Sequence, residues 1–331
     1  MKNGKFRIGI IAILIFLCCC EDNNNAGRKI LSMNPYAGLT DSIQRFPENA
    51  KIYLERGLLL SQNNQHELAA IDYEQSFKLQ PNESTTLIYI SNLLTLNKVR
   101  DAVNLLKKSI LKFPSNVEFR RRLSDIYIES GEYEKALIEY NEMIRLDSTD
   151  FETWHNRGTV LLQLKDTVTG IEALEKSYSL QPIQYTGLKL ADLYAIMKNP
   201  RALEICDEII ARDTGGVSTD ALFAKAVYFS ETKQYDKALN FFDTVIKIDW
   251  TLVDAHNEKG IVLFEQRKYD DALKVFKTAA SVSNTNADAY FWMGRCYEAK
   301  QDTSMAIVNY DRAVSLDPSF REARERRKKL Q

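Results

Sequence analysis

The chain has 331 residues, of which 45% are hydrophobic and 27% are charged, and its formal net charge is −1. This balance provides no overall attraction toward nucleic acid or an acidic surface, so it excludes partners that are recruited by net charge alone. The chain holds only 13 glycines and 7 prolines, a low content that a nearly all-helical protein requires.

The first residues have the pattern of a secretion signal. Lys2, Lys5 and Arg7 form a positive start, and an apolar run of ten residues, 8–17, follows. That run is too short to span a bilayer as a stable helix, and a charged start before such a run is typical of a signal peptide. We expect residues 1–19 to be this signal.

Three cysteines end the apolar run, in the order Leu17-Cys18-Cys19-Cys20. The stretch resembles the bacterial lipobox, in which a leucine stands three residues before a cysteine and small residues lie between them. The resemblance implies a lipoprotein, with diacylglycerol on the Cys20 thiol, cleavage before that residue and a fatty acyl group such as palmitate on the new amine. Cys19 is the second choice. Such a cysteine anchors a protein to a membrane without a transmembrane helix. The other interpretation is an ordinary secretory signal with incidental cysteines.

Residues 20–34 are expected to hold the lipidated cysteine and a flexible tether, because the polar stretch 21–25 is typical of a disordered linker. The acidic pair that opens this stretch, Glu21-Asp22, resembles the surface-export signals of some Gram-negative lipoproteins. A solvated linker is the other interpretation of the same residues.

An N-terminal capping helix is predicted over residues 35–49. Leu39, Ile43 and Phe46 recur at helical spacing there, and Pro47 follows them. A stack of helical hairpins needs such a cap, because its first hairpin would otherwise expose an apolar face.

A helical hairpin then recurs along the chain. In residues 253–286, apolar or small residues fall at helical spacing in two stretches, which the polar turn 266–268 separates. The pattern returns 34 residues later, where Gly294 takes the place of Gly260. Repetition at this period indicates a stacked-repeat protein. One small residue of each second helix marks the register, with spacings of 33, 34, 34, 32, 36, 34 and 34: Ala69, Ala102, Ala136, Gly170, Ala202, Ala238, Ala272 and Ala306.

The unit resembles the tetratricopeptide repeat, which has small residues at three fixed positions, large ones between them and a proline near its end. The fourth unit matches with Trp154, Gly158, Leu161, Gly170, Leu174, Ser177 and Pro182. The resemblance implies an all-α, right-handed superhelical solenoid of about eight helix-turn-helix units over residues 50–318. Each hairpin cannot bury its apolar face alone, so stability is expected to come from stacking.

Some units depart from the pattern. Repeat two has Ser91 as the small residue of its first helix, and its turn at Asn97-Lys98 is predicted to be one residue short, as is the turn of repeat five at Asn199-Pro200. Residues 213–218 contain Gly215-Gly216 and lengthen the spacing, so they are a candidate flexible joint, or else a slightly longer turn. Residues 319–331 are predicted to form a basic C-terminal capping helix.

The sequence carries no recognisable catalytic pattern. It contains no HExxH or paired-cysteine metal spacing, no P-loop, no GxGxxG and no GxSxG. Cys206 and Cys296 are interpreted as small core residues. The basic run 321–329 lacks interleaved aromatic residues, so it is interpreted as a solvated cap and not as a nucleic-acid site. We therefore predict a protein that is not an enzyme and takes neither cofactor nor metal.

In this family the first helices line a concave groove, and fixed positions of each repeat point into it. Apolar residues on such a face are typical of interfaces, although some of them, Trp292 above all, could instead pack against the next helix. No repeat has the lysine and asparagine pair with which chaperone-binding members clamp a terminal carboxylate. The predicted groove residues are Leu54, Leu58, Arg121, Arg122, Asp125, His155, Asn156, Phe223, Asn257, Phe264, Phe291 and Arg295.

These observations predict a bacterial cell-envelope lipoprotein, anchored through Cys20 and most consistent with the outer membrane. Its solenoid would serve as a scaffold that binds a protein or peptide partner in the concave groove, during envelope assembly or maintenance. Two alternatives stay open at this point. The solenoid could self-associate as a structural homo-oligomer, or its groove aromatics could bind glycan or peptidoglycan.

Overall fold

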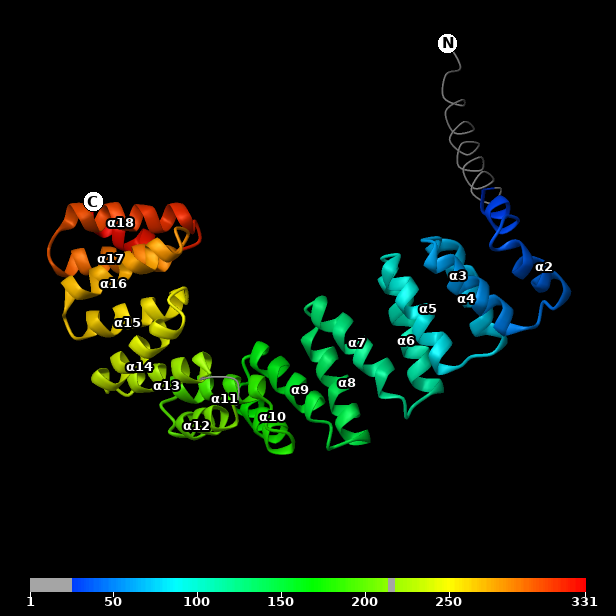
Figure 1. Cartoon of the computed structure of the whole chain (residues 1–331), viewed down its shortest axis with the longest axis horizontal. Helices are drawn as coiled ribbons and strands as arrows, with labels where there is room; N and C mark the ends of the chain where they lie inside the picture. The colour runs from blue at the N-terminus through cyan, green and yellow to red at the C-terminus, as the bar shows by residue number, and fades with distance from the viewer. Residues whose placement is uncertain (1–25, 214–217) are drawn as a thin grey trace, which may run out of the picture. The chain divides into compact units, whose positions relative to one another are not determined.

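The computed structural model describes residues 26–213 and 218–331. Cys19, Cys20, the predicted signal and Gly215-Gly216 lie outside these residues. The described chain is helical throughout and contains no strand (Figure 1). The helices are α2 Ala37–Arg45, α3 Ala50–Gln62, α4 His66–Leu79, α5 Glu83–Thr95, α6 Val99–Lys112, α7 Val117–Glu129, α8 Tyr133–Leu146, α9 Phe151–Gln163, α10 Thr167–Leu180, α11 Gln184–Ile196, α12 Arg201–Arg212, α13 Thr219–Glu231, α14 Tyr235–Ile248, α15 Val253–Glu265, α16 Tyr269–Val282, α17 Ala287–Ala299, α18 Thr303–Leu316 and α19 Arg321–Leu330.

The helices from α3 to α18 form eight consecutive hairpins, which confirms the predicted fold class. The chain divides into two compact units between Ser148 and Thr149. Unit 1 contains α2 and the hairpins α3/α4, α5/α6 and α7/α8. Unit 2 contains the five hairpins from α9/α10 to α17/α18, followed by α19. Within each unit, the second helix of a hairpin packs against its own first helix and against the first helix of the next hairpin.

Every hairpin turn has the same backbone geometry. One residue of each turn has a positive φ, and the N–H of the residue after it bonds to a carbonyl five residues earlier, as from Gln65 to Leu60 at 2.8 Å and from Lys98 to Leu93 at 2.8 Å. This is the Schellman arrangement that ends an α-helix. The predicted short turns in repeats two and five are therefore wrong. The positive-φ residues are Asn64, Asn97, Gly131, Lys165, Lys198, Lys233, Arg267 and Gln301.

The uniform turn also corrects the register of repeat two. Because α5 begins at Glu83, the slot that Gly57 fills in repeat one is filled by Ile90, which is fully buried, whereas Ser91 is exposed. A side-chain cap marks the start of most first helices; for example, the Asn82 side chain accepts a hydrogen bond from the Thr85 N–H at 2.9 Å. Such a cap satisfies one of the free N–H groups at a helix start.

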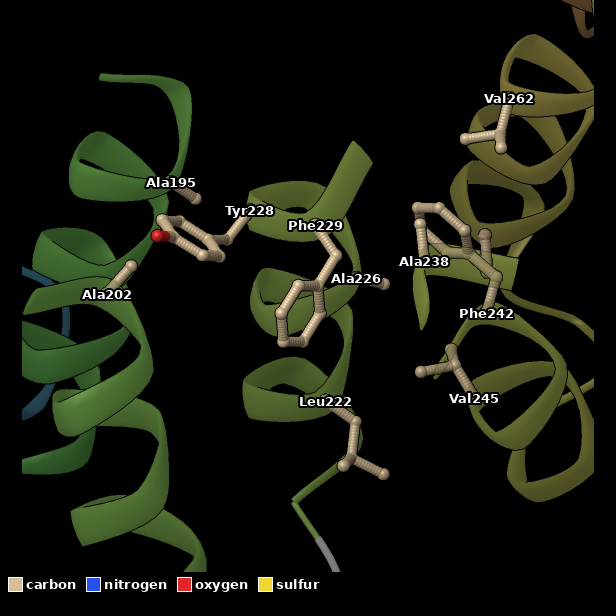
Figure 2. Packing of buried hydrophobic residues seen from close by; sticks show 11 residues of the cluster. Ala195, Ala202, Leu222, Ala226, Tyr228, Phe229, Ala238, Phe242, Val245 and Val262 are labelled. Carbon is tan, nitrogen blue, oxygen red and sulfur yellow. The ribbon is translucent and has the colours of Figure 1, made fainter. Parts of the chain in front are cut away.

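Repeats five and six are packed together although the described chain is interrupted between them. Ala195 and Ala202 of repeat five share one buried cluster with Ala226 and Phe229 of α13, and Phe242 of α14 extends it (Figure 2). The alanines let the helices approach closely, and the aromatic rings fill the space that remains. The joint predicted at 213–218 has most of its residues outside the described ones, and it stays a prediction.

The N-terminal end of unit 1 differs from the prediction. Residues 26–31 are helical, and Ile30 and Leu31 pack against the buried cluster around Leu60 and Tyr73. The predicted flexible tether is therefore wrong over residues 26–31, since the apolar side chains of Ile30 and Leu31 gain burial by docking on repeat one.

Helix α2 lies within the predicted cap range, but its contacts differ from those expected. Tyr36, which precedes α2, is the buried residue of this segment, whereas Phe46 at its end is exposed.

A buried ion pair joins the two helices of repeat one. The Arg56 guanidinium donates two hydrogen bonds of 2.7 Å to the Asp72 carboxylate, and a third bond of 2.9 Å to the Thr40 hydroxyl of α2. Thr40 in turn donates to the Leu31 carbonyl at 2.7 Å. This chain of bonds ties the N-terminal segment to the first hairpin.

Candidate functional site

A pocket of about 370 Å³ opens on the first helices of unit 1. In each unit, we call the surface that the first helices present, on the side away from the second helices, the first-helix face. The pocket lies between α3 and α5, with one wall from α7. Its walls combine apolar side chains with hydroxyl and amide groups, and its lining residues are Leu58, Ser61, Gln62, Tyr73, Leu87, Ile88, Ser91, Asn92, Thr95 and Arg122.

Two of the predicted groove residues of unit 1 line this pocket. Leu58 has a relative exposure of 37%. Arg122 reaches from α7 to the Ser91 hydroxyl of α5 at 2.8 Å and pairs with Glu118 at 2.9 Å. The other three predicted residues of unit 1 stand outside the pocket lining: Leu54 packs into the repeat-one cluster, Arg121 lies 3.8 Å from Glu118, and Asp125 is exposed on α7.

In unit 2, the predicted residues of α9 are half-buried. His155 Nδ1 lies 3.0 Å from the Thr186 hydroxyl, and its ring meets the Tyr185 ring edge-on with centroids 4.6 Å apart. Burial and the nearby Lys189 cation lower the pKa of His155 to about 4. The imidazole is therefore neutral near pH 7, and with these contacts it serves as a packing and hydrogen-bonding group. Asn156 lies beside it on α9.

An aromatic cluster with one cation lies on α15 and α17. The Phe264 and Trp292 rings lie 5.3 Å apart, and the Arg295 guanidinium stands 5.2 Å from each ring centroid. Arg295 also lies 3.7 Å from Glu322 of α19. These contacts place Phe264 beside Arg295, and they show that Trp292 packs against its neighbours.

Three predicted groove residues point into the packing between helices. Phe291 is 3% exposed and contacts Phe320 and Tyr310, with centroids 4.8 and 5.8 Å away. Asn257 is 8% exposed, and its amide exchanges hydrogen bonds with Asn286, the cap of α17. The prediction that Phe291 and Asn257 are open to a partner is wrong, because each faces the next helix of the stack.

Phe223, the third of these residues, is half-buried on α13. Its ring meets the Phe242 ring edge-on, with centroids 5.8 Å apart. Phe223 is therefore only partly accessible on the first-helix face.

The first helices of unit 2 carry a row of acidic residues that the predicted groove residues do not include. Asp220, Asp254 and Asp288 each occupy the first turn of α13, α15 and α17. Burial raises the pKa of Glu258, and the charges of Asp254, Glu231 and Asp288 raise it further. The sequence does contain a signal for this row, since an aspartate recurs at a spacing of 34 residues, and acidic residues are favourable at helix starts.

Asp192 gives a test of this electrostatic arrangement. Asp192 is exposed on α11, but desolvation by the neighbouring helices and the nearby Asp220 carboxylate raise its pKa to about 6 from an ordinary 3.8. Between pH 3.8 and about 6 the folded chain therefore keeps a proton on Asp192 that the unfolded chain has lost. Because of this group, the free energy of unfolding falls as pH rises through that range. We expect Asp192→Asn to raise the thermal midpoint at about pH 7.5, with a gain that shrinks at about pH 5. Equal gains at both pH values would contradict the assignment.

The described residues carry little sign of reactive chemistry. Cys206 and Cys296 are fully buried core residues, as predicted, and burial raises the pKa of each thiol to about 12. Across residues 26–213 and 218–331 no group of three or more His, Cys, Asp or Glu side chains is arranged to hold a metal ion. Among the same residues no helix is both long enough and apolar enough to cross a membrane.

Family models match several segments of the chain. A model described as TPR repeat matches residues 125–165, and models described as tetratricopeptide repeat match residues 263–325, 50–83 and 151–184. No curated protein sequence matches the chain.

Solved structures with similar folds come from several proteins. The C-terminal part of a TPR repeat-containing protein from Cytophaga hutchinsonii is 14% identical, with a TM-score of 0.51, and the match covers 72% of this chain and 97% of that one. The APC/C hetero-tetramer Cut9-Hcn1 is 13% identical, with a TM-score of 0.52 and coverage of 89% and 59%. PilW, a type IV pilus biogenesis factor, is 16% identical, with a TM-score of 0.53 and coverage of 63% and 97%. At these identities the likeness concerns the fold.

Proposed function

Because this chain belongs to the tetratricopeptide repeat family, we propose that it is a lipid-anchored scaffold of the bacterial cell envelope. In this proposal its first-helix face binds a protein or peptide partner. The repeat fold itself supports a role in protein–protein interaction, since stacked repeats present extended surfaces to partners. The observation that carries the proposal is the pocket on α3 and α5, where the side chain of Leu58 is exposed beside uncharged polar groups.

The envelope part of the proposal rests on residues 1–20 and not on the fold. A charged start, an apolar run and three cysteines support export and lipidation at Cys20, with the outer membrane as the proposed location. PilW is described as a pilus biogenesis factor, which is compatible with an envelope role but is a likeness in fold alone. We expect Cys20→Ser, expressed in a Gram-negative host, to lose incorporation of labelled palmitate. Unchanged incorporation in that variant, with loss in Cys19→Ser, would move the anchor to Cys19.

Crosslinked capture from membranes tests partner binding. Two variants place charge on the first-helix face: Leu58→Glu/Ile88→Glu in unit 1 and Tyr185→Glu/Ile196→Glu in unit 2. All four positions are partly or well exposed, so folding should persist and circular dichroism verifies it. A partner that the wild type captures is expected to be lost with at least one of the two variants, because a buried carboxylate opposes an apolar contact.

A matched control places the same charges on the second helices. Ile71 of α4 and Ile138 of α8 are 62% and 60% exposed, more than Leu58. Ile71→Glu/Ile138→Glu is expected to capture as the wild type does. If both first-helix variants capture normally and the control does not, the second helices bind the partner and the proposed site is wrong.

A further inference from the structure

The pocket of unit 1 differs in charge from the first helices of unit 2. Its lining residues include one cation, Arg122, and no carboxylate. In unit 2 the corresponding helices carry the acidic row of Asp220, Asp254 and Asp288, which Glu258 extends. An acidic residue of a partner would therefore meet a cation in the lining of the unit 1 pocket, whereas the first turns of α13, α15 and α17 present carboxylates.

The floor of the pocket fits an apolar side chain. Leu58 from α3 and Leu87 and Ile88 from α5 are the aliphatic residues of the lining, and Leu58 is exposed. A volume of about 370 Å³ lies in the range of sites that enclose a small ligand or an anchoring side chain. An aliphatic or aromatic anchor placed there would bury apolar surface on both partners, which is the main favourable term in association.

Arg122 of α7 is the one charged residue of the pocket lining. Its guanidinium uses one N–H for Glu118 and one for the Ser91 hydroxyl, two of the five donors that it carries. The side chain is 32% exposed, so part of it is accessible to a ligand. Ser91 holds the guanidinium at the pocket wall, and an arginine held in place loses less entropy when it binds a carboxylate.

We propose that the unit 1 pocket takes an extended peptide segment with an apolar anchor and, next to it, an aspartate or glutamate that pairs with Arg122. The inference rests on the proposed function, in that it names the partner chemistry of the same first-helix face. A basic segment is the opposite outcome, because it would be repelled by Arg122 and attracted to the acidic row of unit 2.

Selection from displayed random peptides on the full chain in detergent tests this chemistry. The wild type is expected to enrich peptides that combine Leu, Ile or Phe with Asp or Glu. Arg122→Glu is expected to reverse the charge preference toward Lys and Arg, because the substitution inverts the one charge of the lining. Enrichment of basic peptides by the wild type, or no enrichment at all, overturns the proposal.

Fluorescence anisotropy of the best labelled acidic peptide then locates its binding site. Leu58→Glu and Arg122→Glu are each expected to weaken binding about tenfold or more, the loss of one charge-assisted hydrogen bond or one buried anchor. Leu111→Glu is the control, since Leu111 is 85% exposed on the second helix α6, and it should leave the affinity unchanged.

The two proposals fail separately. If membrane capture is lost with Tyr185→Glu/Ile196→Glu but kept with Leu58→Glu/Ile88→Glu, the scaffold function stands and the unit 1 assignment is wrong. An acidic peptide whose affinity does not change in Arg122→Glu likewise overturns the assignment without affecting the scaffold function.

Discussion

Gly260→Leu is expected to lower the free energy of unfolding by about 3 kcal/mol or more, the upper range for overpacking a well-packed core. A Cβ atom at Gly260 would lie 2.4 Å from Cε1 and 2.6 Å from Cζ of Phe276, closer than carbon atoms approach. The remaining leucine atoms have no space between α15 and α16, so the hairpin must open. Urea unfolding of the full chain, followed by circular dichroism, measures the change.

A control and a rescue make this result specific. A Cβ atom at Gly38 of α2 would have no neighbouring atom within 4 Å, so Gly38→Ala should be neutral or stabilising, as removal of a helical glycine is. Adding Phe276→Ala to Gly260→Leu should recover part of the loss, because it removes the ring that the leucine strikes. A Gly260→Leu midpoint within error of the wild type would show that the register of repeat seven is wrong.

Breaking the buried ion pair of repeat one is expected to have a comparable effect. Arg56 and Asp72 are 8% and 2% exposed, and Arg56→Met would leave the Asp72 carboxylate without its partner. Removing one member of a buried pair typically costs about 3–5 kcal/mol, because an unpaired charge stays buried. The variant also loses the bond to Thr40, so the N-terminal segment should exchange its amide hydrogens faster. Urea unfolding and hydrogen exchange measure the two effects.

The double variant Arg56→Met/Asp72→Leu separates the charge from the packing. Replacing both partners with apolar residues is expected to restore most of the stability, since no charge then remains buried. Lys78→Met, which removes an exposed i,i+4 pair with Glu74, should cost about 0.5 kcal/mol or less. If Arg56→Met costs no more than Lys78→Met, the pair is solvated in solution and the buried arrangement is wrong.

The repeat period is predictable because each hairpin solves the same packing problem. A small residue faces an aromatic ring sixteen residues later in Gly57/Tyr73, Gly260/Phe276 and Gly294/Tyr310. This sixteen-residue spacing is recognisable in the sequence, because a different spacing would separate the small residue from the aromatic ring that packs on it. Repeat two shows the limit of this signal. Ile90 fills the small-residue slot there, and the neighbouring serine suggests a shifted register and a short turn.

The turns are harder to predict for a physical reason. A left-handed residue is usually predicted from glycine, yet only Gly131 among these turns is one. The other seven repeats place asparagine, lysine, arginine or glutamine there. Their backbone strain is offset by the hydrogen bonds that close the helix end, and those bonds involve no particular side chain.

The sequence predicts that the candidate site lies on the first helices, but it predicts less well which residues line the site. The repeat position places Leu58 and Arg122 on the first-helix face, and both line the pocket. The same position places Phe291 against α19 residues, because the last hairpin is covered by a helix that ends the stack. Whether a side chain at this position is accessible to a partner depends on the helix that packs next to it. The position of a residue within one repeat does not specify that neighbouring helix.

Site-specific photo-crosslinking in cells shows whether the first-helix face or the second helices contact the partner. A photoreactive phenylalanine analogue is placed at Leu58 or Tyr185 on first helices, and at Ile71 or Ile138 on second helices. The second-helix positions are the more exposed, so random collisions would favour them. We expect a discrete crosslinked partner from Leu58 or Tyr185 and none from Ile71 or Ile138. A partner crosslinked only from the second helices would contradict it.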